Sequence, residues 1–265
     1  MSTPLRWNAE LYAANTAHHR QGDDDLLGGL DLRPTARVLD LGCGVGDFTA
    51  RLATVVPRGE VVGIDANPDM VAAARLRAER GRPVYHVCRA QDLNRVAAEA
   101  SFDLVVSRAV LHWVSAVDHP AVLRQVFRAL RPGGVFRAEF GGHGQIAKAK
   151  AILDEVSIGL GGRAAPWFFP SPEDYRPLLA DAGFQITPDG WVCLLHQRRR
   201  FPRETDLIGW LRSQVLLAYD AGLPADAVTA FRRRAEERAL RELRREDGSY
   251  DQDYVRLDLH VRRPA

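Results

Sequence analysis

Short apolar segments alternate with segments of helical periodicity through the first 140 residues of the chain. Five apolar runs predict buried strands, at residues 37–41, 60–65, 83–88, 102–106 and 135–140. Helices are predicted between them at 47–56 and 68–80, the second opened by Asn67 as cap and Pro68 at the first helical position. Breakers at 131–134 end a further helix. Such alternation indicates a doubly wound, Rossmann-like α/β sheet.

Additional helices interrupt the alternation at both ends of this core. They are predicted at residues 8–20, 23–30, up to about 160, 172–182, 204–221 and 224–245. A strand region is expected over 184–196, and alternation over 254–261 predicts a half-exposed final strand. We therefore expect a single domain over 1–265. Residues 1–30, 141–170 and 203–248 are expected to form a helical lid over the carboxyl ends of the strands, where ligands bind in open α/β sheets.

Composition and charge narrow the class of protein only slightly. The net charge of +2 is too small to indicate nucleic-acid binding by itself, and the arginine groups at 198–200, 232–234 and 244–245 alternate with glutamates. We expect them to form a solvated, salt-bridged face. The three cysteines have no metal-site or disulfide spacing, and no apolar run has membrane-spanning length. A cytoplasmic location without membrane, nucleic-acid or metal partners is expected.

The chemistry of the chain is concentrated where the first predicted strand ends. The run Leu-Asp-Leu-Gly-Cys-Gly-Val-Gly-Asp at 39–47 leads from the strand through Gly42, Gly44 and Gly46 into a helix. Glycine permits backbone conformations forbidden to other residues and lets a ligand approach the main chain. About 20 residues later, the second strand closes on Asp65, where a carboxylate can accept both hydroxyls of an adenosine ribose.

A glycine turn followed by such an acid can bind NAD and S-adenosylmethionine equally well. The spacing of the glycines distinguishes the two cofactors. The spacing here is G-x-G-x-G rather than the G-x-G-x-x-G of dinucleotide folds, and Asp40 lies in the strand end two residues before the first glycine. The run at 39–47, followed by Gly-Ile-Asp-Ala-Asn-Pro-Asp-Met at 63–70, resembles the class I S-adenosylmethionine-dependent methyltransferases. The resemblance implies a seven-stranded sheet with an antiparallel last strand and S-adenosylmethionine as cofactor.

The candidate cofactor-binding residues come from the first four predicted strand ends. They are Asp40, Gly42, Gly44, Gly46, Asp65, Ala66, Met70, Ala90, Gln91 and Arg108. Asp65 is expected to bind the ribose, while Met70 is equally well interpreted as a core residue. Relatives commonly have an acid, which accepts the adenine amine, at the place of Arg89. Arginine only donates, so the acceptor is expected at Gln91 or Asp92.

The fourth strand leads into Leu111-His112-Trp113, which is similar to the subgroup containing trans-aconitate and juvenile hormone acid methyltransferases. These relatives methylate carboxylates. In the hormone-acid enzymes a glutamine and a tryptophan hold the acceptor carboxylate, and the matching positions here are His19 and Trp113. We assign these two as catalytic. Further acceptor contacts are expected from Tyr12, His112, His143, Trp167 and Phe168. The alternative interpretations are that His19 is a surface residue and that Trp113 only packs against its neighbours.

The sequence therefore predicts methyl transfer to a small molecule, most simply to the carboxylate of an apolar acid. A carboxylate is ionised at neutral pH and needs no base, whereas a phenol, amine or carbon acceptor is served by a base such as His19, His112 or His143. An O-, N- or C-methyltransferase of a secondary metabolite is the alternative. An RNA methyltransferase would require a continuous basic surface. A non-catalytic cofactor-binding protein would keep the glycines and Asp65 without a productive pocket.

Replacing His19 with Gln separates the carboxylate reading from the alternative. Glutamine keeps a hydrogen-bond donor, so the rate at saturating acceptor should be largely retained if His19 only orients a carboxylate. If His19 is a general base, the replacement should lower that rate by about 10²–10⁴. Methyl transfer measured at saturating acceptor tests this, and a collapse of the rate contradicts the carboxylate role.

Overall fold

The computed structural model describes residues 7–15, 22–79 and 82–265. The chain divides into two compact units. The smaller comprises Met1–Thr16, Gly144–Trp167 and His196–Val255, and the larger comprises Ala17–His143, Phe168–Leu195 and Arg256–Ala265. Residues 22–30 and 168–170, which the sequence placed with the helical insertions, thus belong to the larger unit.

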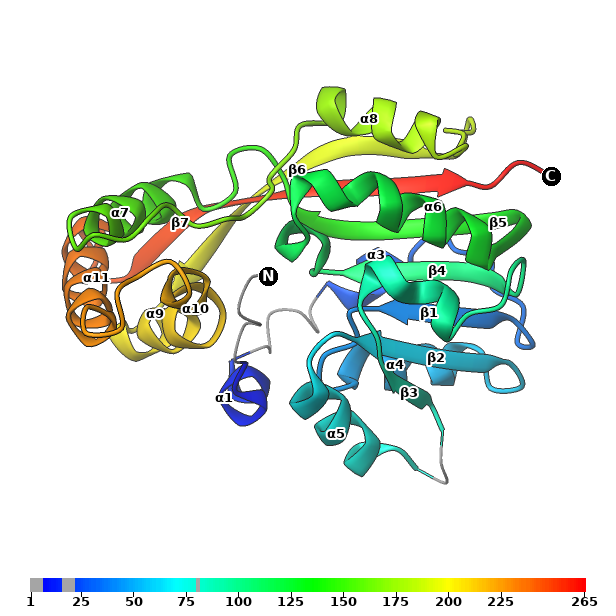
Figure 1. Ribbon diagram of the computed structural model, residues 1–265, viewed down its shortest axis with the longest axis horizontal. Helices are drawn as coiled ribbons and strands as arrows, with labels where there is room; N and C mark the ends of the chain where they lie inside the picture. The colour runs from blue at the N-terminus through cyan, green and yellow to red at the C-terminus, as the bar shows by residue number, and fades with distance from the viewer. Residues whose placement is uncertain (1–6, 16–21, 80–81) are drawn as a thin grey trace. The chain divides into compact units, whose positions relative to one another are not determined.

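A seven-stranded sheet of order β3-β2-β1-β4-β5-β7-β6 forms the centre of the larger unit. The strands are β1 (Arg37–Leu41), β2 (Glu60–Asp65), β3 (Val84–Val87), β4 (Phe102–Arg108), β5 (Leu130–Gly141), β6 (Trp191–Phe201) and β7 (Tyr250–Arg262). β1 to β5 pair in parallel, whereas β7 is antiparallel to β5. The predicted fold class is confirmed. The carboxyl ends of β1 to β5 therefore meet at one edge, as Figure 1 shows.

Helices cover both faces of this sheet. They are α3 (Asp23–Leu27), α4 (Asp47–Val55), α5 (Pro68–Arg77), α6 (His119–Ala129) and α8 (Pro172–Asp181), with short 3₁₀ helices η1 (Ala90–Arg95), η2 (Leu111–Trp113) and η3 (Ala116–Asp118). The predicted start of α5 is confirmed, because the Asn67 side chain accepts from the N–H groups of Asp69 and Met70 at 2.9 and 3.0 Å. Asn67 thereby fixes the helix that follows the second strand end.

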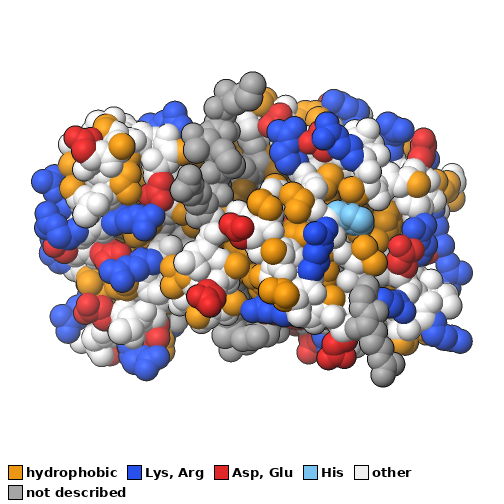
Figure 2. All heavy atoms as spheres, turned by 60° about the horizontal axis from the view of Figure 1, so that its bottom comes forward, with side chains coloured by type: hydrophobic (Ala, Val, Ile, Leu, Met, Phe, Trp, Pro, Cys, Tyr) orange, Lys and Arg blue, Asp and Glu red, His pale blue; other side chains and the backbone are white. Residues whose placement is uncertain are grey.

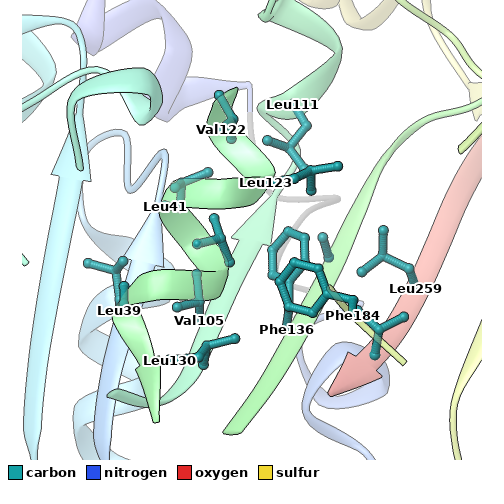
Figure 3. Packing of buried hydrophobic residues seen from close by; sticks show 14 of the residues in the cluster. Leu39, Leu41, Val105, Leu111, Val122, Leu123, Leu130, Phe136, Phe184 and Leu259 are labelled. Atoms are coloured by element: carbon teal, nitrogen blue, oxygen red, sulfur yellow. The ribbon is translucent and has the colours of Figure 1, made fainter. Parts of the chain in front are cut away.

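The main core lies between the sheet and α6. Figure 3 shows Val122 and Leu123 of α6 with Leu39 and Leu41 of β1 and with residues of β4, β5 and β7. Side chains of this cluster such as Val122, Leu123 and Leu39 are 0% exposed. Fully burying one such aliphatic side chain contributes roughly 1.5–3 kcal/mol. A second cluster on the other face joins Leu26 of α3 and Leu52 of α4 to β1, β2 and β4. The strand ends that carry the candidate site are thus fixed from both sides.

The final strand is buried on both faces, so the prediction of a half-exposed strand is wrong. Its apolar residues Leu257, Leu259 and Val261 are 0% exposed, yet Arg256, Asp258 and His260 on the alternate positions are also nearly inaccessible at 3%, 4% and 2%. Their burial is possible because charges are paired inside the unit. Asp258 forms an ion pair with Arg137 and accepts from Trp191 Nε1 at 2.6 Å.

Several predicted element boundaries also differ. The expected turn at 131–134 is included in β5, because Leu130 pairs with Phe102 before the register shifts at an irregularity. β6 begins at Trp191 rather than at residue 184. The predicted helix over 204–221 is three consecutive pieces with a π-helical turn in the middle, and only the outer pieces are regular α-helix.

The smaller unit is mainly helical. It contains α1 (Ala9–Ala14), α7 (Ala147–Ile158), α9 (Glu204–Trp210), the π-helix η4 (Leu211–Val215), α10 (Leu217–Asp220) and α11 (Val228–Glu242). Tyr219 and Phe231 stack with centroids 5.0 Å apart. The Arg199 guanidinium lies over the rings of Phe201 and Trp210 at 4.8 and 5.2 Å, which joins the end of β6 to α9.

Ion pairs dominate the surface of this helical unit, as the alternation of arginine and glutamate predicted. In the predicted group 232–234, Arg233 pairs with Glu237 at 3.0 Å and Arg232 pairs with Asp220 at 2.6 Å. Figure 2 likewise shows basic and acidic side chains interspersed on one face of the molecule. The expected salt-bridged face is confirmed. Within the part of the chain that the structure describes, no helix is long and apolar enough to span a membrane.

A buried histidine makes stability depend on pH. His119 is 0% exposed and its Nδ1 lies 3.0 Å from the Tyr175 hydroxyl. Burial lowers the pKa of His119 to about 4. Between about pH 6.5 and pH 4 the unfolded chain therefore takes up a proton that the folded protein excludes, so stability present above pH 6.5 is lost as the pH falls.

We predict that proton uptake by His119 in the unfolded chain lowers the free energy of unfolding by about 2 kcal/mol when the pH falls from 7 to 5. His119→Gln keeps a polar partner for Tyr175 without titrating in this range, so it should lose correspondingly less stability over the same interval. Urea denaturation of both proteins at the two pH values measures the difference. Equal losses would contradict the assignment.

Candidate functional site

The glycine turn after β1 admits no side chains at its first and last glycine. Gly42 and Gly46 have φ of 87° and 88°. A Cβ at Gly42 would lie 2.5 Å from Val110, and one at Gly46 would lie 2.7 Å from the Tyr85 hydroxyl oxygen. The Gly42 N–H donates to the Ile64 carbonyl at 2.8 Å, which binds the turn to the end of β2. The result is a tight turn whose backbone conformation and close packing both require glycine.

Asp65, at the end of β2, is the polar centre of this edge. One carboxylate oxygen accepts from Gly44 N at 3.0 Å and the other from Asn67 N at 2.8 Å. Partial burial raises the pKa of Asp65, while the two backbone N–H groups act in the opposite direction. A carboxylate has about four lone-pair sites, so each oxygen retains capacity for one more donor. The geometry suits a vicinal diol.

Asp40 lies beneath the turn rather than at its surface. It is 1% exposed, and its carboxylate accepts from the Thr49 hydroxyl at 2.6 Å. Burial is the main cause that raises the pKa of Asp40 to about 7. Met70 is also buried, at 3% exposure, which agrees with the reading of a core methionine, whereas Ala66 is exposed. Of these predicted contacts, Ala66 and Asp65 are the most accessible at this strand end.

The side chains at the end of β3 show how the protein accommodates Arg89, which stands where relatives commonly have an acid. The Arg89 side chain is 66% exposed and donates to Asp92 at 2.8 Å. Gln91 is half-buried, and its amide nitrogen donates to Asp118 of η3 at 3.3 Å. Ala90 is half-buried at the start of η1. Asp92 is thus engaged by arginine, while Gln91 keeps its carbonyl oxygen.

Arg108, at the end of β4, is bound from two sides. Its Nη1 donates to Asp23 of α3 at 2.6 Å, its Nε lies 4.0 Å from Glu139 of β5, and its guanidinium lies 5.9 Å from the Phe48 ring centroid. The side chain is 6% exposed. Arg108 therefore connects α3, β4 and β5 and places a positive charge beneath this edge.

His112 follows in η2, and its tautomer is fixed. The backbone N–H of Gly141 donates to His112 Nδ1 at 3.2 Å, so the ring proton must be on Nε2. Burial, with a smaller contribution from the charge of Arg256, holds the pKa of His112 well below its usual value. The ring lies 5.5 Å from that of Trp113 and 5.7 Å from that of Phe169. His112 is a neutral hydrogen-bond donor.

The remaining predicted acceptor contacts are distributed over both units of the chain. Phe168 packs in the core with its ring 4.7 Å from His119. His143 is exposed, and its main-chain N–H donates to the Pro170 carbonyl at 2.9 Å. Tyr12 and Trp167 belong to the smaller unit, where their rings lie edge-to-face with those of Trp7 and Tyr219, at centroid distances of 5.5 and 6.0 Å. His19 lies outside the described residues.

Sequence reasoning missed Glu139, Arg256, Asp118 and Phe169. Arg256 Nε lies 3.6 Å from the same Glu139 oxygen that faces Arg108, and the Arg256 side chain is 4% exposed. A signal was present for Glu139, since it interrupts an apolar strand near its carboxyl end. No local signal indicates Arg256. It reaches Glu139 because the register of β7 against β5 places Arg256 opposite Gly141.

Comparison with known proteins gives consistent matches. A family model described as a methyltransferase domain matches residues 38–134. An uncharacterised methyltransferase from Schizosaccharomyces pombe is 36% identical over 190 residues, 68% of this chain and 71% of that protein. Trans-aconitate 2-methyltransferase from Mycolicibacterium gilvum is 32% identical over 234 residues, 85% of this chain and 86% of that protein. The crystal structure of a SAM-dependent methyltransferase from Methanosarcina mazei superposes with a TM-score of 0.53 at 17% identity, covering 88% of this chain and 94% of that one.

The residues at this edge fit S-adenosylmethionine. Asp65 has acceptor capacity for both ribose hydroxyls. Gln91 and the exposed Ala66 lie at the neighbouring strand ends, where the adenine is expected. A set of carboxylate, amide and main-chain groups is appropriate to this cofactor.

Asp65→Ala should weaken S-adenosylmethionine binding by at least about tenfold. Two hydrogen bonds to a charged acceptor are lost, and each contributes roughly 1.5–3 kcal/mol. Asp47→Ala is the matched control, since this nearby acid is paired with Arg77 at 3.2 Å outside the turn and should leave affinity unchanged. Calorimetry on folded variants measures both. Unchanged affinity in Asp65→Ala, or tighter binding of NAD than of S-adenosylmethionine, would overturn the assignment.

Proposed function

Because the chain belongs to the S-adenosylmethionine-dependent methyltransferases, we propose that it methylates a carboxylate oxygen of a small-molecule acceptor. The enzyme class and the cofactor follow from the family. The acceptor and the methylated atom are the proposal, and an O-, N- or C-methyltransferase of another metabolite is its alternative.

The observation that carries the proposal is the fixed, neutral state of His112. Its Nδ1 is occupied by the Gly141 N–H at 3.2 Å, and its pKa lies well below the usual histidine value. This imidazole has a donor at Nε2 and no free basic nitrogen. A phenol or amine acceptor at η2 would need a base, whereas a carboxylate needs only donors that orient it. His112 beside Trp113 therefore favours an acceptor that is already ionised.

Charge near η2 supports the same conclusion. The guanidinium groups of Arg108 and Arg256 both face one oxygen of Glu139, at 4.0 and 3.6 Å, and both side chains are almost fully buried. Asp23, which accepts from Arg108 at 2.6 Å, and the shared Glu139 balance these two charges, but the charges are weakly screened in such surroundings, so an anion is attracted locally by the guanidinium nearest to it. The Mycolicibacterium gilvum relative is named for trans-aconitate, a tricarboxylic acid. We therefore extend the predicted acceptor class from apolar acids to acids that carry more than one carboxylate.

The residues of the chain then have simple roles. When bound, S-adenosylmethionine would supply a methyl group carried on a cationic sulfur. A carboxylate oxygen would accept this methyl group, and the sulfur would remain with the cofactor product as a neutral thioether. His112 Nε2–H and Trp113 orient the carboxylate, and the glycine turn and Asp65 hold the cofactor. Arg256 attracts the acid without contributing to proton transfer.

A panel of acids identifies the acceptor class. Enzyme incubated with methyl-labelled S-adenosylmethionine and either trans-aconitate or a long-chain fatty acid should yield a labelled product that mild alkali releases, since esters are cleaved and ethers, amines and C-methyl groups are not. The rate at saturating acceptor should be flat between pH 6 and pH 9, because His112 does not titrate there. An alkali-stable product, or a rate that rises with a pKa near 7, would favour the alternative.

Arg256→Gln tests the proposed attraction for the acid. Because one positive charge near the acid is lost, the acceptor KM should increase by about tenfold, while cofactor affinity is unchanged. Arg262→Gln is the control on the same strand, because its partner Asp189 lies at 2.9 Å on an exposed part of the unit. Equal acceptor KM values in the two variants would contradict a role for Arg256.

A further inference from the structure

Because Arg89 stands where related chains commonly have the acid that accepts the adenine amine, Gln91 and Asp92 are the two candidate acceptors nearby. The structure distinguishes them. Asp92 accepts from Arg89 at 2.8 Å and lies 3.9 Å from Arg95. Its carboxylate is therefore occupied by two cations from its own short helix. Arg89 itself is 66% exposed and offers only donors. Arg89 therefore cannot accept a hydrogen bond from an adenine amine, and Asp92 could accept one only in competition with two guanidinium groups.

Gln91 differs because an acidic partner fixes its amide. Its nitrogen is 3.3 Å from a carboxylate oxygen of Asp118. An ionised carboxylate accepts but cannot donate, so the NH₂ group must face Asp118 and the amide oxygen must face away from it. Without that partner, the two ends of the amide could exchange by rotation. Asp118 therefore converts a side chain of ambiguous polarity into a fixed acceptor.

The position of this acceptor matches the expected cofactor. Gln91 is the second residue of η1, the 3₁₀ helix that follows β3 in the chain, and β3 lies beside β2 with Asp65 opposite Val87. The ribose-binding carboxylate and the Gln91 amide therefore lie at adjacent strand ends. Adenine offers a donor at its 6-amino group and an acceptor at N1, and a fixed amide oxygen complements the former.

We propose that the Gln91 amide oxygen accepts the 6-amino group of the cofactor's adenine, and that Asp118 is the positioning residue that keeps this oxygen available. The pair takes over the selection for adenine that an acid performs in related chains. This inference rests on the cofactor of the family and is independent of the acceptor proposed above, so the two can fail separately.

Binding of two nucleosides that differ at the 6-position and at N1 of the base provides the test. S-adenosylhomocysteine carries a 6-amino donor and an N1 acceptor, whereas S-inosylhomocysteine carries an N1–H donor and a 6-oxo acceptor, and the 6-oxo group would face the Gln91 oxygen. Calorimetry should show that the wild-type protein binds the adenosyl compound more tightly, and Gln91→Met should reduce this preference by about tenfold. No methyl transfer is involved, so the result does not depend on the acceptor.

Asp118 variants separate positioning from packing. In Asp118→Ala the amide is released and can present its NH₂ group to the 6-oxo compound, so the preference should fall mainly because S-inosylhomocysteine binds better. Asp118→Glu keeps an acceptor-only partner and should restore much of the preference. A purely structural role would weaken both compounds equally, and that result would overturn the proposal.

Asp92→Asn is the matched control within the same helix. It removes the partner of Arg89 and should leave the ratio of the two affinities unchanged. A collapse of the ratio in Asp92→Asn, together with an unchanged ratio in Gln91→Met, would assign the adenine acceptor to Asp92 instead. Thermal unfolding of each variant confirms that the ratios are measured on folded protein.

Discussion

The carboxylate of Asp65 joins the two turns on which the rest of the site is built. It accepts from Gly44 in the turn after β1 and from Asn67 in the turn after β2. Glycines have no side chains with which to stabilise their own conformation, so the tight turn depends on this neighbour. Each such bond to a charged acceptor contributes about 1.5–3 kcal/mol. Asn67 in turn caps α5, and the same carboxylate therefore also determines where that helix begins.

Two further side chains at this edge gain a defined polarity from partners that can act in only one way. The Gly141 N–H can only donate, which leaves the proton of His112 on Nε2. The Asp118 carboxylate can only accept, which leaves the oxygen of Gln91 outward. Histidine and glutamine are otherwise ambivalent as donors and acceptors. The strand ends of this protein thus present groups of fixed character without relying on strongly charged residues at the surface.

The sequence predicted the features that depend on local pattern. Apolar runs located β1, β2 and β4, and Asn67 with Pro68 located the start of α5. It could not predict contacts between distant segments. The burial of Arg256 and Asp258 depends on the register of β7 against β5, which alternation alone does not encode, so the strand looked half-exposed. Similarly, spacing identifies Asp65, whereas Asp118 becomes visible only when strand ends are brought together.

The buried pair of Arg137 and Asp258 constrains how this chain can diverge. Loss of either residue alone leaves an uncompensated charge inside the sheet, and Trp191 loses its hydrogen-bond partner if Asp258 is replaced. Replacement of both charges by apolar residues of similar volume avoids that cost. Substitutions at positions 137 and 258 should therefore be accepted together along a lineage. In a library of single variants these positions would look immutable, although the fold does not require charge there.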